Sequence, residues 1–88
     1  MEVVLDARLM GERTKAHTYL KEQLELPEYY GNNLDALYDC LTELSDTLII
    51  IEYKDEADSY FDKVYHVMLE AEKSNEELTI VLLDDDQL

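Results

Sequence analysis

Apolar residues along the chain form short continuous runs that alternate with stretches of helical spacing. The run Val3-Val4-Leu5 is β-branched and bounded by acidic residues, which predicts a first strand. Residues 47–53 and 78–83 are almost entirely apolar, a pattern typical of strands covered on both faces of a sheet. Between these runs, helix-forming residues with apolar side chains three or four positions apart predict three helices, at about 12–24, 34–44 and 59–73.

The order of the predicted elements is β-α-α-β-α-β, and no linker or repeat divides the 88 residues. This order predicts an α/β fold with a small three-stranded parallel sheet packed by helices and joined by right-handed crossovers. We expect one domain over residues 1–88, of which the acidic residues 84–88 form a flexible tail.

The ends of the predicted helices carry recognisable signals. Leu26-Pro27 is expected to end the first helix, because a residue that precedes proline avoids the helical region. Asn32 or Asn33 can cap the second helix, and Ser74-Asn75 is expected to end the third.

Acidic residues outnumber basic residues by 22 to 7, which gives the chain a formal net charge of −15. Long-range repulsion at this charge opposes binding to nucleic acid and to anionic membranes, but it leaves cations, metals and basic proteins as partners. The acids are also concentrated, because no Lys or Arg occurs between Lys21 and Lys54, whereas eight Asp and Glu residues do.

Part of this charge falls on one face of the second helix. At 100° per residue, Asp35, Tyr38, Asp39 and Thr42 form a narrow stripe beside the stripe of leucines that is expected to face the core. Such a face is ordinarily just solvated, but Asp39 lies in mid-helix four residues after another acid, where like charges repel. A surface that accepts cations would explain this arrangement.

Tyr29-Tyr30-Gly31 directly precedes this helix. Two adjacent tyrosines in one extended loop cannot both enter a small core, so we expect one of them to be exposed. An exposed tyrosine beside carboxylates is typical of a recognition surface, although it can also simply lie along the surface. Gly31 is expected to let the chain turn and to let a partner approach the backbone.

The chain lacks the motifs of the common catalytic and metal sites, so we expect no enzyme, no metal and no cofactor. His17 and His66 have no neighbour at metal-ligand spacing and are interpreted as ordinary residues of amphipathic helices. Cys40 is the only cysteine, which excludes an internal disulfide and, with the acidic N-terminus and the absence of a long apolar run, favours a cytoplasmic protein.

Residues 26–42, with the sequence LPEYYGNNLDALYDCLT, closely resemble the signature segment of the barstar family, intracellular inhibitors of the secreted ribonuclease barnase. The resemblance implies a three-stranded parallel sheet and a helix that plugs the active site of a basic ribonuclease, with carboxylates where RNA phosphates would bind. We expect a 1:1 complex with such a ribonuclease, a monomer when free, and, from the net charge, no nucleic acid or membrane partner. The positions that match the inhibitory surface of the family are Tyr29, Gly31, Asn33, Asp35, Tyr38, Asp39, Thr42 and Glu70, with Asp39 at the centre.

The chain departs from this family at four positions near the implied surface. Tyr38, Glu43 and Leu44 stand where barstar has Trp, Gly and Trp, and Ser74 replaces a further acid. The change at Glu43 adds a carboxylate, which suits a partner with a different basic rim. Two alternatives remain: an acidic module for another basic protein, and an acyl-carrier-like protein, which would need an all-helical fold and an Asp-Ser-Leu attachment site.

Overall fold

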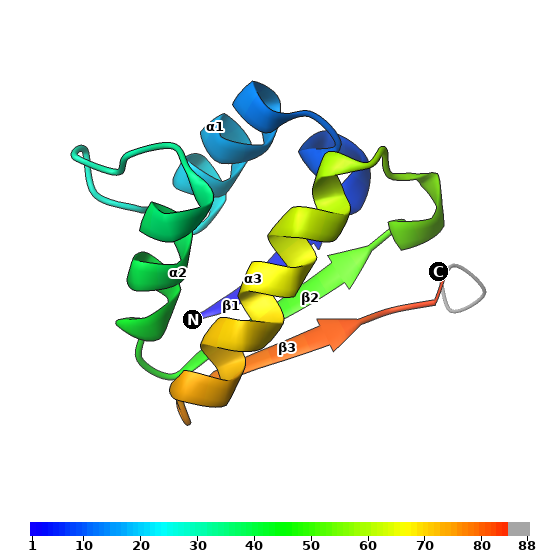
Figure 1. Cartoon of the computed structure of the whole chain (residues 1–88). Helices are drawn as coiled ribbons and strands as arrows, with labels where there is room; N and C mark the ends of the chain where they lie inside the picture. The colour runs from blue at the N-terminus through cyan, green and yellow to red at the C-terminus, as the bar shows by residue number, and fades with distance from the viewer. Residues whose placement is uncertain (85–88) are drawn as a thin grey trace.

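The computed structural model of the chain describes residues 1–84 and contains one parallel sheet with the strand order β1-β2-β3 (Figure 1). Its strands are β1 (Glu2–Asp6), β2 (Thr47–Glu52) and β3 (Leu78–Leu82), and its helices are α1 (Arg13–Gln23), α2 (Leu34–Thr42) and α3 (Tyr60–Ser74). Two short 3-10 helices that were not expected, η1 (Ala7–Met10) and η2 (Lys54–Glu56), follow the first two strands. The α/β class, the parallel three-stranded sheet and the order β-α-α-β-α-β are confirmed.

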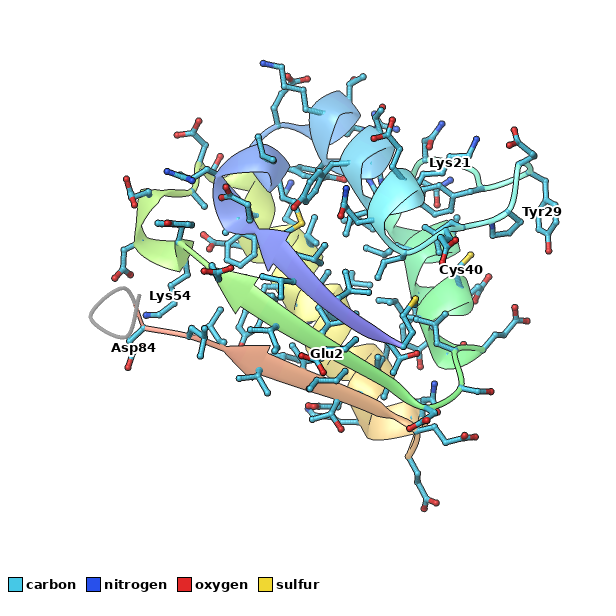
Figure 2. All side chains as sticks on the ribbon, turned by 180° about the vertical axis from the view of Figure 1, so that it is seen from behind. Glu2, Lys21, Tyr29, Cys40, Lys54 and Asp84 are labelled. Carbon is cyan, nitrogen blue, oxygen red and sulfur yellow. The ribbon has the colours of Figure 1, made fainter. Side chains whose placement is uncertain are left out.

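All three helices lie on the same face of the sheet, as the views from the two sides show (Figures 1 and 2). Burial therefore alternates along β2, where Thr47, Ile49 and Ile51 are buried while Leu48 and Ile50 are half-buried. The expectation that the apolar strands are covered on both faces is wrong within residues 1–84. Crossovers of one hand that step from β1 to β2 to β3 in one direction place their helices on one face only.

The third strand is also less buried than its apolar sequence indicates. It lies at an edge of the sheet, and of its five residues only Leu78 is fully buried. Asp84 follows this strand and lies 3.3 Å from the ammonium group of Lys54. The other residues of the predicted acidic tail lie outside the described residues.

The core lies between the sheet and the three helices. The second helix contributes Leu37 and Leu41, which are fully buried, whereas Leu34 and Leu44 at the ends of its leucine stripe are only partly buried. Full burial of one such side chain stabilises the fold by about 1.5–3 kcal/mol. The other fully buried large side chains are Leu5, Met10, His17, Leu20, Leu24, Ile49, Ile51, Val64 and Met68.

The first helix ends earlier than its proline predicts. Glu25 adopts the left-handed conformation with φ 53°, and the Leu26 N–H donates to the Lys21 carbonyl at 3.0 Å. This is a Schellman motif with glutamate at the position that usually holds glycine. The end of α1 is therefore set by a left-handed residue, and Pro27 lies beyond it. The third helix ends at Ser74, with Asn75 as its C-cap, as expected.

Candidate protein-binding site

The second helix is fixed at its start by Asn33. The Asn33 side-chain oxygen accepts a hydrogen bond from the Ala36 N–H at 2.8 Å, and its amide group donates to the Gly31 carbonyl at 3.1 Å. One predicted site residue thus joins the helix to the preceding loop. Asp35 lies in the first turn, where the helix dipole favours a negative charge.

Acidic side chains lie on the outer side of α2. Asp35, Asp39 and Glu43 are all exposed, while Tyr38 and Thr42 are half-buried along the same side. The Thr42 hydroxyl donates to the Asp39 carbonyl at 2.8 Å, so it is engaged within the helix. The ion pairs among residues 1–84 include none of these three carboxylates. Their negative charge is therefore available to a partner.

One of the two tyrosines of the loop is exposed and the other is buried, as expected. Tyr29 is 86% exposed and projects from the tip of the loop, whereas Tyr30 is only 5% exposed (Figure 2). Gly31 does not have a positive φ, and the left-handed residue beside it is Asn32, with φ 53°. A Cβ atom at position 31 would lie 3.0 Å from the Asn33 side-chain nitrogen, so glycine leaves room for the helix cap.

A buried hydrogen-bonded cluster holds this loop against two helices. His17 is 1% exposed, its Nδ1 lies 2.6 Å from the Tyr30 hydroxyl, and its Nε2 lies 2.7 Å from the Tyr60 hydroxyl. Burial lowers the pKa of His17, and the nearby positive charge of Arg13 lowers it further. The ring is therefore neutral, donating to one hydroxyl and accepting from the other.

His17 is a residue of a helix with a buried side, as predicted, but its burial in a hydrogen-bonded cluster was not expected; His66 is exposed. The sequence contains a signal that was missed: His17 shares the helical spacing of Leu20 and Leu24 on the core side of α1. Its two hydroxyl partners lie 13 and 43 positions further along the chain, and only the fold brings them together.

A hollow of about 310 Å³ lies between the loop and α2. Three predicted site residues line it, namely Tyr29, Gly31 and Asp39, together with Cys40 and Glu43. Burial raises the pKa of the Cys40 thiol, and the charges of Glu43 and Asp39 raise it further. The thiol is therefore protonated at neutral pH, and the hollow combines an aromatic ring with two carboxylates.

The remaining predicted site residues lie along helices α2 and α3. Asn33 and Asp35 line a second hollow of about 280 Å³, together with Arg13, Tyr60 and Lys63. The Tyr38 hydroxyl lies 2.9 Å from the Ser74 Oγ, at the end of α3. Glu70 lies one turn before Ser74 and is paired with Lys73 at 3.5 Å. Asp35 and Asp39 thus border different hollows.

Together, these features define a small α/β protein in which one helix and the loop before it present exposed carboxylates and an exposed tyrosine. Residues 1–84 match the family described as "Barstar (barnase inhibitor)". A protein of Bacillus subtilis (strain 168) that bears the name "Putative ribonuclease inhibitor YrdF" is 36% identical over an alignment of 88 positions, which covers 92% of this chain and 97% of the relative. The chain belongs to the barstar family.

No helix within residues 1–84 is long and apolar enough to cross a membrane.

Proposed function

We propose that this protein inhibits a small basic ribonuclease of the barnase type by binding over its active site as a 1:1 complex. The loop at Tyr29 and the outer side of α2 form the contact surface, and the carboxylates of Asp35 and Asp39 occupy the place of RNA phosphates. Membership of the barstar family and the name of the Bacillus subtilis relative support this function. The inhibitor acts by occlusion and contributes no chemistry of its own.

The observation that carries the proposal is the set of exposed carboxylates without a cationic partner on α2. A ribonuclease site must attract phosphates, so it presents a concentration of Arg, Lys and His side chains. Asp39 and Glu43 line the same hollow as the exposed Tyr29, which gives a cation both a negative charge and an aromatic face. The net charge of −15 adds long-range attraction toward such a basic enzyme.

The proposal is tested by titrating small basic ribonucleases, barnase among them, with the unsubstituted protein and with Asp39→Ala. Removing one member of an ion pair that is buried in the complex costs about 3–5 kcal/mol, so the dissociation constant should rise by more than about 100-fold. Glu56→Ala is the matched control, because it removes the same charge from η2, at the far end of β2 from α2 (Figure 1).

The control should leave the dissociation constant within about threefold, since an exposed charge at a distance is screened by salt. An equal loss for both variants would mean that only net charge matters, and it would contradict the assigned surface. If no ribonuclease of the panel is inhibited while another basic protein binds, the chain is instead an acidic module for that protein.

A further inference from the structure

The last residue of α3 reaches the outer side of α2. The Ser74 Oγ lies 2.9 Å from the Tyr38 hydroxyl, and the two residues are 36 positions apart in the chain. Ser74 is exposed and Tyr38 is half-buried, so the hydrogen bond lies at the surface, among the residues assigned above to partner binding. It is a side-chain link between the two helices within that surface.

The neighbouring residue holds the backbones of these two helices together. The Asn75 side-chain nitrogen donates to the carbonyls of Leu41 and Leu44 at 3.0 and 2.8 Å, and its side-chain oxygen accepts from the Glu77 N–H at 3.0 Å. The last carbonyls of a helix have no hydrogen-bond donor within the helix. The Asn75 side chain, at the end of α3, supplies such a donor to carbonyls at the end of α2. Ser74 and Tyr38 are therefore kept within reach of each other independently of their own hydrogen bond.

We infer that Ser74 is a positioning and specificity-determining residue of the binding surface, which holds the Tyr38 ring in one orientation through the hydroxyl–hydroxyl bond. The inference rests on the proposed function and adds to it the chemistry that this part of the surface recognises. Fixing a mobile side chain at an interface costs affinity, and a ring that is held before binding avoids most of that cost.

The same link determines the charge that this part of the surface presents. Tyr38 and Ser74 form a neutral hydrogen-bonding pair, and Glu70, one turn before Ser74 on α3, already lies 3.5 Å from the Lys73 ammonium group. The carboxylates of α2 are not paired in this way. The partner therefore places its cations opposite α2 and a neutral hydrogen-bonding side chain opposite the end of α3.

The test is a double-mutant cycle on Tyr38→Phe and Ser74→Ala, with the ribonuclease of the panel that binds most tightly as the probe. Each variant removes the hydrogen bond, so each should weaken binding by about three- to tenfold, mainly through faster dissociation. The double variant should be no weaker than either single variant. Ser74→Thr keeps a hydroxyl and should restore most of the affinity.

Two controls separate positioning from folding. Ser59→Ala removes an exposed serine hydroxyl at the other end of α3, where the side chain makes no capping hydrogen bond, and should change nothing. Urea unfolding of Ser74→Ala should match that of the unsubstituted protein, because the lost hydrogen bond is exposed.

Additive losses in the cycle, or an unchanged dissociation rate for Ser74→Ala, would overturn the inference while a loss in Asp39→Ala still upheld the proposed function. If Asp39→Ala has no effect either, both fail. If no ribonuclease of the panel binds the unsubstituted protein, the proposed function is wrong and this inference is overturned with it.

Discussion

Replacing His17 with phenylalanine should destabilise the protein although the apolar character of its surroundings is kept. The substitution leaves the hydroxyl of Tyr30, a residue that is only 5% exposed, without the nitrogen that lies 2.6 Å away. A buried polar group without a partner costs about 1–3 kcal/mol. Tyr60 is half-buried and its hydroxyl can bind water, so that bond contributes about 0.5–1.5 kcal/mol. The expected loss is therefore about 1.5–4.5 kcal/mol.

Urea unfolding at pH 7.5, followed by far-UV circular dichroism, measures this loss, and a double-mutant cycle with Tyr30→Phe identifies its cause. When both polar partners are removed, no hydroxyl is left unpaired at this point, so the double variant should be more stable than the sum of the single losses predicts, by about 1–2 kcal/mol. His66→Phe, on the exposed side of α3, should stay within about 0.5 kcal/mol of the unsubstituted protein. Strictly additive losses would refute the assignment of His17 as the polar link between α1 and the loop.

Three other properties can be tested in the same way. Burial lowers the pKa of His17 below its ordinary value of 6.5, so below pH 6.5 the unfolded chain binds a proton that the folded protein does not. The stability advantage of the unsubstituted protein over His17→Gln should therefore be full above pH 6.5 and shrink as the pH falls below it. Urea unfolding at several pH values measures this advantage. Glu25 has φ 53°, so Glu25→Gly should raise the free energy of unfolding by about 0.5–1 kcal/mol, whereas Glu25→Ala, which removes the same charge, should not. The raised pKa of Cys40 predicts slower alkylation by iodoacetamide at pH 8 than for an unperturbed thiol, and a bound ribonuclease should slow it further because Cys40 lines the hollow beside Asp39.

The elements and the exposure of the loop could be predicted from local patterns. The spacing of the leucines identified α2 and its core side, and the impossibility of burying two adjacent tyrosines predicted that either Tyr29 or Tyr30 would be exposed. These properties depend on residues that are close together in the chain, so local sequence patterns are enough to predict them.

The features that were missed depend on contacts between distant segments. An apolar run such as 47–53 indicates a strand, but whether helices cover one face of the sheet or both depends on the direction in which the crossovers step. The hydrogen bond between Tyr38 and Ser74 and the two bonds from Asn75 to α2 likewise join segments more than 30 positions apart. No local pattern reports such contacts.

The central claim is that this protein and RNA compete for one site on the ribonuclease. Its most direct test measures the dissociation constant of the complex at increasing concentrations of a nucleotide bound in the active site, such as guanosine 3′-monophosphate. Mutually exclusive binding predicts that the apparent dissociation constant of the complex rises linearly with the nucleotide concentration, without a plateau. A dissociation constant that does not change with nucleotide concentration, together with a detectable ternary complex, would contradict the account.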